Sequence, residues 1–445
     1  MNIPFLDLKV QYQTMREQVQ SCAEQVHEDS HVAAHSKPSS ESFEMVRTLS
    51  WIWRRIVELI NLPIWLLAKL VPKSKHVWVF GAWVGNRYND NPKWLFEYVN
   101  ASVPSIRAIW LSRDKRLVRS LRERGFESYY SYSIKGYWYS ARAFVGIVCQ
   151  GLSDINRFVT PPFLVNTWHG TPIKKVLKDV ERVSYTKSKI QKLSPFSESP
   201  DRYNLVTAES EIEAEILKRS FSSAVFEVTG QPRNDVLVKC KSSGEPARGQ
   251  EGSYAPKRIL YLPTHRMNGK SRIFSQLAAE FADLDPVLGH LNALLLIKLH
   301  YLHQAEAKEV AQKLRGLKNV RVLLDEEFGG DVYPLLASCD ILITDYSSVY
   351  VDFLLTERPI IFYCFDLQTY MAVDRELNFD YNEVTPGPKC FNLDEVAHWI
   401  QRFLEDDSLY KKERKEMKDK FHRWQDGLNS KRVSETIMRM TEGSK

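Results

Sequence analysis

Short apolar runs alternate with helical patterns along most of the chain, and this alternation is the feature that most limits the possible folds. The runs are residues 76–81, 106–111, 144–149, 163–167, 205–208 and 225–229, then 258–262, 293–299, 320–324, 340–344 and 359–364. Apolar runs of four to eight residues between turn formers are typical of buried strands. Strands that alternate with helices predict a parallel sheet with helices on both faces.

The length of the chain and one irregular stretch divide this pattern into domains. At 445 residues the chain is too long for one ordinary core, and we expect two domains. Residues 239–257 contain many turn formers and no periodicity, which predicts a linker or an insertion. The sequence therefore predicts an α/β fold with Rossmann-like domains at 75–238 and 258–405. A helical tail follows at 406–445, and its charges are most simply a solvated helix face.

The segment before the first strand differs in character from the rest. Residues 1–45 are interpreted as a leader and linker, and residues 46–74 as an amphipathic helical segment that contains Trp51, Trp53 and Trp65. A membrane span needs about 20 mainly apolar residues, and charged residues and a proline interrupt the run here. The segment therefore favours a position at the membrane surface, with a helix of the protein core as the open alternative.

The composition is that of a globular protein, with 44% hydrophobic and 26% charged residues. The formal charge of +6 suits phosphate-bearing ligands or an anionic membrane surface. It is weak support for nucleic acid, and we predict no nucleic-acid partner. The six cysteines form no C-x-x-C pair and the N-terminus has no secretory signal pattern, so we expect a protein that faces the cytoplasm.

Several polar clusters share one position, directly after an apolar strand. Ligands of open parallel sheets bind at the carboxyl ends of the strands, so we expect these clusters to lie together. The clusters contain His169, Gly170 and Thr171; Arg233 and Asp235; Thr264 and Arg266; His300; and Asp345, Ser347 and Ser348. Arginine forks, hydroxyls and histidines suit a nucleotide diphosphate. Each residue alone has a simpler explanation as a hydrogen-bonded histidine, a helix cap or an ion pair.

Sequence patterns for several other chemistries are missing. The chain contains neither a P-loop nor a G-x-G-x-x-G fingerprint, which removes the usual support for ATP hydrolysis and dinucleotide redox chemistry. It also contains no H-E-x-x-H pattern and no paired acidic loop motif. We therefore predict no cofactor and no metal ion.

In their order along the chain, the clusters resemble the CDP-glycerol glycerophosphotransferase family of teichoic acid and capsule synthesis. The motifs are W-H-G-T-P, T-G-x-P-R-N-D, Y-x-P-T-x-R, a K-x-H strand end and T-D-Y-S-S-V, and the resemblance covers about residues 75–405. It implies two domains of the GT-B type that face a central cleft. It also implies peripheral attachment to the cytoplasmic face of the bacterial plasma membrane.

The reaction that the resemblance implies is transfer of a polyol phosphate from CDP-glycerol or CDP-ribitol to a lipid-linked or glycan acceptor, with release of CMP. His169 is then the general base that takes the proton of the acceptor hydroxyl, a role that suits a group titrating near neutral pH. His300 and Asp235 are the other predicted catalytic residues, with Asp235 supporting His169. The predicted substrate-binding residues are Gly170, Thr171, Arg233, Thr264, Arg266, Asp345, Ser347 and Ser348.

Other interpretations remain open at this point. Residues 1–28 separately resemble the N-terminus of sugar aminotransferases that use pyridoxal phosphate, but no continuation of the chain carries that resemblance further. A GT-B glycosyltransferase acting on a nucleotide sugar would share the fold and the diphosphate chemistry. A non-catalytic, membrane-associated assembly scaffold would explain the tryptophan-rich segment but not the polar clusters.

Overall fold

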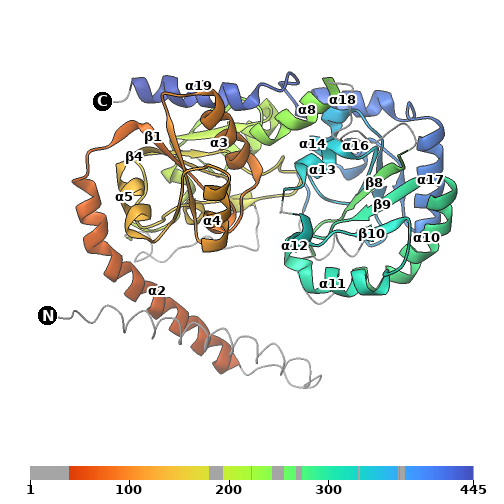
Figure 1. The fold of residues 1–445 in the computed structure, drawn as a ribbon, viewed down its shortest axis with the longest axis horizontal. Coiled ribbons are helices and arrows are strands. Elements are labelled where there is room, and N and C mark those ends of the chain that lie inside the picture. Colours follow the sequence, from red (N-terminus) through yellow and green to blue (C-terminus); the bar gives the residue numbers. More distant parts are fainter. Residues whose placement is uncertain are drawn as a thin grey trace. The chain divides into compact units, whose positions relative to one another are not determined.

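The computed structural model describes residues 40–179, 194–221, 223–242, 255–266, 273–328, 331–368, 370 and 376–443. The chain divides into two compact units, Met1–Pro63 and Ile64–Lys445, and the second unit contains both sheets (Figure 1). The leader at 1–28 lies outside the described residues.

The first sheet, which forms the N-terminal domain, is parallel, with strand order β3-β2-β1-β4-β5-β6-β7. Its strands are β1 (Ser74–Phe80), β2 (Arg107–Ser112), β3 (Ser128–Tyr130), β4 (Ala143–Val148), β5 (Phe163–Asn166), β6 (Leu205–Ala208) and β7 (Val225–Val228). The helices between them are α3 (Asp90–Ser102), α4 (Lys115–Glu123), α5 (Ile134–Arg142) and α7 (Glu211–Lys218), and α8 (Asp235–Ser242) follows β7. The strand order reverses between β1 and β4.

The second sheet, which forms the C-terminal domain, is also parallel, with strand order β10-β9-β8-β11-β12-β13. Its strands are β8 (Lys257–Leu262), β9 (Ala293–Ile297), β10 (Val320–Val322), β11 (Ile341–Thr344), β12 (Ile360–Tyr363) and β13 (Lys389–Cys390). Its helices include α9 (Ile273–Gln276), α10 (Ala278–His290), α11 (Gln304–Lys313), α12 (Asp325–Phe328), α13 (Tyr333–Ser338), α14 (Val349–Phe353), α16 (Tyr381–Val384) and α17 (Leu393–Glu405). Here the order reverses between β8 and β11.

Both predicted parallel sheets are therefore confirmed, and each predicted apolar run forms a strand. The strands β3 and β13 were missed, because they are only three and two residues long and carry no apolar run of their own. Neighbouring residues of a strand point to opposite faces, and both faces are buried here. Trp78 and Trp110 belong to the core on one face of the first sheet, and Val79 and Ile109 to the core on the other. This double burial produces the continuous apolar runs of the sequence.

Helix starts are set by local capping. Asp114 accepts the Arg116 N–H at 2.7 Å at the start of α4, and Asn392 accepts the Glu395 N–H at 2.9 Å at the start of α17. At the start of α7, Ser210 accepts the Glu213 N–H at 3.3 Å, and the carboxylate of Glu213 accepts the Glu209 N–H. These caps satisfy amides that have no partner within the helix.

The tryptophan-rich segment forms one helix, α2 (Ser40–Lys69), which starts inside the predicted linker rather than after it. Leu59, Ile60 and Leu67 are 67%, 63% and 65% exposed, and Trp51 and Trp53 are also exposed. The side chains in the last turn of α2 and beyond pack differently, since Ala68 is buried against Ala141 and Val159. None of the helices in the described residues is long and apolar enough to cross a bilayer.

The charged C-terminal tail is more than a solvated face. It forms α18 (Lys411–Phe421) and α19 (Asn429–Glu442), shown in blue in Figure 1. Phe421 is buried in the core of the C-terminal domain, whereas Val433 and Ile437 are buried in the core of the N-terminal domain. The tail therefore crosses from the second domain back to the first and ties the two together.

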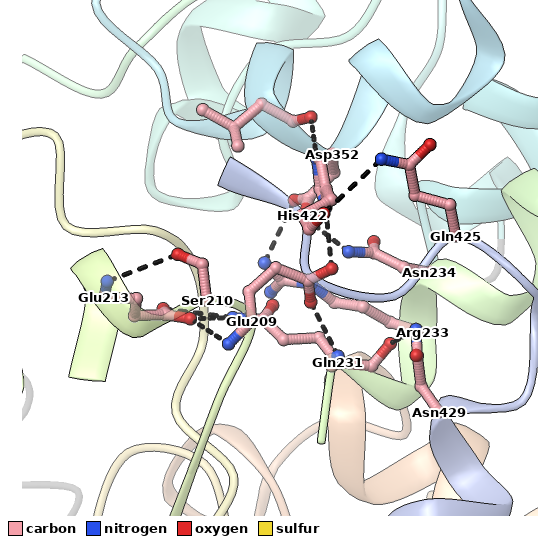
Figure 2. A network of polar contacts seen from close by, with 12 residues as sticks. Glu209, Ser210, Glu213, Gln231, Arg233, Asn234, Asp352, His422, Gln425 and Asn429 are labelled. Atoms are coloured by element: carbon pink, nitrogen blue, oxygen red, sulfur yellow. Dashed lines mark hydrogen bonds and ion pairs between the residues drawn. The ribbon is translucent and has the colours of Figure 1, made fainter. Parts of the chain in front are cut away.

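A buried polar network lies where the tail crosses (Figure 2). His422, between α18 and α19, is fully buried; its Nδ1 lies 2.6 Å from Glu209 Oε1 and its Nε2 lies 2.7 Å from the Val351 carbonyl oxygen. Both partners only accept hydrogen bonds, so both ring nitrogens of His422 carry protons. A charged histidine therefore joins the loop after β6 to α14 of the other domain.

We expect the free energy of unfolding to fall as the pH rises above neutrality because of this histidine. Burial alone would lower the pKa of His422, but Glu209 and the Val351 carbonyl raise it above its ordinary value. A raised folded-state pKa gives stability that is complete below the unfolded pKa of about 6.5 and is lost as the pH rises through the folded-state pKa. Urea unfolding followed by tryptophan fluorescence at a series of pH values checks this.

The variant His422→Gln separates the charge from the packing. We expect a loss of roughly 3–5 kcal/mol at neutral pH, because Glu209 would keep a buried charge without its counter-ion. The pH dependence should become flatter than in the wild type. His398→Gln, at an exposed histidine of α17, is the matched control and should leave both quantities unchanged. An unaltered pH slope in His422→Gln would contradict the charged state of His422.

Candidate active site

The carboxyl ends of strands from both domains meet at one pocket of about 300 Å³. The N-terminal domain contributes the loop after β5, and the C-terminal domain contributes the loops after β8, β9 and β11. In the second sheet, β8 and β11 flank the point where strand order reverses, which is where open α/β sheets bind ligands. The predicted site residues that line the pocket are His169, Gly170, Thr171, Thr264, His300, Ser347 and Ser348.

His169 stands at the end of β5 with its orientation fixed by the backbone. Its Nδ1 lies 3.0 Å from the carbonyl oxygen of Cys149, which can only accept a hydrogen bond. The neutral ring therefore carries its proton on Nδ1, and the proton-accepting lone pair is on Nε2. The residue before it, Trp168, has φ of 54°, a strained conformation held by Asn91, whose Nδ2 donates to the Thr167 and Trp168 carbonyls. This geometry suits a general base.

A buried carboxylate organises the loops around His169. Asp154 accepts the backbone N–H groups of Val84, Cys149 and Gln150 at 2.7, 3.0 and 2.8 Å. It thereby fixes the carbonyl that orients His169 and the turn that carries Trp83, whose ring lies 6.3 Å from the His169 ring. Burial raises the pKa of Asp154 to about 6, against the effect of these amides. Asp154 was not among the predicted site residues, because it belongs to none of the sequence motifs and no pattern relates it to His169.

His300 lies in the pocket in its neutral form. Burial, followed by the positive fields of His265, His303, Arg87 and Lys298, lowers its pKa to about 3. Its Nδ1 accepts the Leu302 N–H at 3.4 Å, so its Nε2 carries the remaining hydrogen. His300 is thus suited to donate a hydrogen bond to a ligand, and a role as proton donor at neutral pH does not fit this environment.

Arg266 is held inside an ionic cluster rather than at the pocket wall. Its guanidinium donates to Asp345 at 2.8 Å and to Asp366 at 2.8 and 3.0 Å. Asp345 is fully buried and also accepts the Thr264 N–H at 2.8 Å. The pair therefore fixes the backbone of the loops after β8 and β11. Neither Arg266 nor Asp345 lines the pocket, and both fix the loops whose other residues do.

Arg233 and Asp235 have structural partners that the sequence did not predict. Arg233 is buried and donates to Asp90 at 2.8 Å and to Asp352 at 3.0 Å, so its terminal nitrogens join the two domains. Asp235 accepts the N–H groups of Asn429 and Ser430 at 2.8 and 2.9 Å and caps α19. Asp235 therefore supports the crossing tail and not His169, because the ring is oriented by the Cys149 carbonyl.

Two hydroxyls from opposite walls of the pocket are suited to a ligand. The Oγ1 atoms of Thr171 and Thr264 are buried and have no hydrogen-bond partner among the described residues. Buried hydroxyls normally have partners, so both are open to an oxygen-rich ligand. The loop that carries Thr171 is fixed to the other domain, since Asn378 donates to the Pro172 and Lys174 carbonyls at 2.8 and 3.0 Å. No group of metal-ligating side chains occurs in the described part of the chain.

Comparison with known proteins identifies the family. The family model described as CDP-glycerol:poly(glycerophosphate) glycerophosphotransferase matches residues 65–439. The chain belongs to this family. It is a transferase of the type that its motifs predicted.

Relatives of this transferase are found among teichoic acid enzymes. It is 26% identical over 402 residues to a teichoic acid poly(glycerol phosphate) polymerase of Bacillus spizizenii, covering 87% of the chain and 98% of the relative. It is 26% identical to a teichoic acid glycerol-phosphate transferase of Staphylococcus aureus, covering 86% and 99%. A structure of the wall teichoic acid polymerase TagF shares the fold, with a TM-score of 0.68 and 22% identity over 92% of this chain and all of that chain.

The close approach of the two domains at Gly170 gives a test of the transferase site. Gly170 has φ of 144°, and a Cβ added there would lie 3.0 Å from Ser348 Oγ and 3.4 Å from Arg233 Nη2. We expect Gly170→Ala to cost roughly 1–3 kcal/mol through backbone strain and to lower activity by displacing Ser348. Thermal unfolding and product release measure the two effects. Gly443→Ala, where nothing lies within 4 Å, is the control and should behave as the wild type.

Proposed function

We propose that this transferase moves glycerol phosphate from CDP-glycerol to a hydroxyl of a lipid-linked or glycan acceptor, releasing CMP, in the synthesis of a teichoic acid-like or capsular polymer. The family description and the teichoic acid relatives support the donor and the polymer class. One structure of TagF, a variant with asparagine in place of a histidine, was soaked with CDPG. The observation that carries the proposal is that His169 lines the same pocket as Thr264, His300, Ser347 and Ser348 of the other domain, whose side chains are suited to bind phosphate oxygens.

The first step follows from the tautomer of His169. Because its Nδ1–H is directed to the Cys149 carbonyl, Nε2 takes the proton of the acceptor hydroxyl. The acceptor oxygen then attacks the phosphorus that bears the glycerol, and CMP leaves in line with the attack. A neutral base at this end of the pocket performs the same task as the histidine of a hydrolytic triad, with a backbone carbonyl as the orienting group.

The C-terminal domain stabilises the phosphates. His300, Ser347, Ser348 and Thr264 line this wall and can donate hydrogen bonds to phosphate oxygens. Arg266 and Asp345 fix the loops that carry them. Preorganised donors in a closed site are worth several kcal/mol when charge builds on the leaving group, with about 3–4 kcal/mol for one donor in well-studied cases.

The donor and the base can be tested together. We expect the purified chain, given membrane acceptor preparations, to release CMP from CDP-glycerol faster than from CDP-ribitol. His169→Gln should lower this release at least about a hundredfold, because glutamine cannot accept the proton. The measurement is nucleotide release resolved by chromatography, with nucleotide sugars as further donors.

His76→Gln is the matched control for this test. The Nδ1 of His76 also lies near a backbone carbonyl, that of Ser105 at 3.2 Å, but this histidine is exposed and does not line the pocket. It should retain wild-type activity. A preference for CDP-ribitol would change the donor assignment. Release of a nucleoside diphosphate from a nucleotide sugar would indicate a glycosyltransferase. Full activity of His169→Gln would exclude His169 as the base.

We also propose that α2 attaches the protein to the cytoplasmic face of the plasma membrane. Its exposed tryptophans and aliphatic residues stand beside Arg54, Arg55 and Lys69, a combination typical of helices that lie at an anionic lipid surface. Tryptophan prefers the headgroup depth, and basic side chains add attraction to anionic lipids. Attachment by α2 would hold the protein at the surface where a lipid-linked acceptor is found.

Membrane attachment can be measured by sedimentation with vesicles of phosphatidylglycerol and phosphatidylethanolamine. The double variant Ile60→Glu and Leu67→Glu should bind at least about tenfold more weakly, because it places two charges at exposed apolar positions of α2. Val287→Glu, at an exposed apolar position of α10, should bind as the wild type. Equal binding of the double variant and the wild type would exclude α2 as the anchor.

A further inference from the structure

Three titratable side chains in contact lead from the pocket into the C-terminal domain, joined by one hydrogen bond and one ion-pair contact. His265, after β8, lines the pocket, and its Nδ1 lies 2.9 Å from the Nε2 of His303. The Nδ1 of His303 lies 3.2 Å from the Oε2 of Glu306 on α11. The side chains of His303 and Glu306 are only 6% and 9% exposed, so solvent screens their interaction weakly.

The partners determine which atoms carry protons. The other oxygen of Glu306 accepts the N–H groups of Phe274 and Ser275 at 2.9 and 3.2 Å. An ionised carboxylate only accepts, so the Nδ1 of His303 carries a hydrogen. The Nε2 of a neutral His303 then accepts from the Nδ1–H of His265. The Nδ1 of His265 therefore keeps its hydrogen toward His303, and Nε2 is the ring nitrogen at which His265 would exchange a proton with a ligand of the pocket.

The other charged groups near this chain have carboxylates of their own. Arg266 is paired with Asp345 and Asp366, and Lys298 and Arg87 are both paired with Asp325. His300 stacks on His265 with ring centroids 5.0 Å apart, and its lowered pKa keeps it neutral. Glu306 is therefore the carboxylate that can balance a proton on the pair of His265 and His303. The pocket wall opposite His169 thus contains a histidine that can carry a positive charge.

We propose that His265 is a further catalytic residue, the general acid that protonates the departing CMP, with His303 and Glu306 as the residues that position it and stabilise its charged form. This inference rests on the proposed function. An in-line displacement needs a base on one side of the phosphorus and charge stabilisation on the other. His169 comes from the N-terminal domain and His265 from the C-terminal domain, on the two walls of one pocket.

The step balances in protons and electrons. The acceptor hydroxyl gives its proton to the Nε2 of His169, and its oxygen forms a bond to the phosphorus that bears the glycerol. The bond from this phosphorus to the oxygen of CMP breaks, and the electron pair stays on that oxygen. The same oxygen takes the proton from the Nε2 of His265. His265 ends neutral and His169 charged, and exchange with water restores both for the next turnover.

The test compares pH profiles of kcat and KM for CMP release from CDP-glycerol by the full chain. His265→Gln can still donate a hydrogen bond but not a proton. We expect kcat to fall roughly a hundredfold or more, KM to change by a few-fold at most, and the alkaline fall of the rate to disappear. Glu306→Gln should move that alkaline fall to lower pH with a smaller loss of kcat, because the charged form of His265 loses its support.

A matched control and the contrary outcomes complete the experiment. His290→Gln, at an exposed histidine of α10 whose Nδ1 lies 2.8 Å from the Pro286 carbonyl, should keep the wild-type profile. A loss that is equal at every pH in both His265→Gln and Glu306→Gln, or an alkaline fall unchanged in both, overturns the role of His265. In either case the wild type still releases CMP, so the proposed function stands. A wild type that releases no CMP from CDP-glycerol overturns the proposed function and the acid role together.

Discussion

The buried contact of Arg233 with Asp90 and Asp352 is the interaction on which the site depends. Its guanidinium joins one carboxylate from each domain at 2.8 and 3.0 Å, and all three side chains are almost fully buried. Charges taken out of water are costly unless geometry and further hydrogen bonds compensate, and here Tyr333 and Asn234 also donate to Asp352. One relative position of the domains satisfies all of these partners. That position brings both walls of the pocket together.

The junction is reinforced by the crossing tail. His422 joins Glu209 to the Val351 carbonyl, and Asp235 caps α19 where it reaches the first domain. The polar network shown in Figure 2 holds this junction, and the apolar residues of α19 add to it by packing into the core of the N-terminal domain. A site built from loops of two domains needs such rigidity. Small displacements of a general base, or of a group that donates a hydrogen bond to phosphate, lower the rate of catalysis. Arg233, His422 and Asp235, which make these connections, do not line the pocket, so its lining residues remain available to contact a ligand.

Three histidines of one site have different properties because their neighbours differ. A backbone carbonyl orients the His169 ring and fixes a hydrogen on its Nδ1. Burial and nearby positive charge keep His300 neutral, with a pKa lowered to about 3. His265 contacts His303, and His303 contacts the buried carboxylate of Glu306. The residue type is the same in each case, and the neighbouring groups determine which ring nitrogen carries a proton and how readily the ring becomes charged.

The sequence by itself determined the strands that carry an apolar run, their parallel arrangement, the order of the motifs and the histidine at the end of β5, because burial on both faces and motif spacing are local properties of the chain. Only the tertiary structure decided what the arginines do: Arg233 and Arg266 were predicted to grip phosphate, yet both bind carboxylates of residues 79 to 143 positions away. It likewise decided that Asp235 caps a helix and that Asp154 fixes the loops around His169. Ion pairing and pKa depend on distance and burial in space, which no local pattern contains.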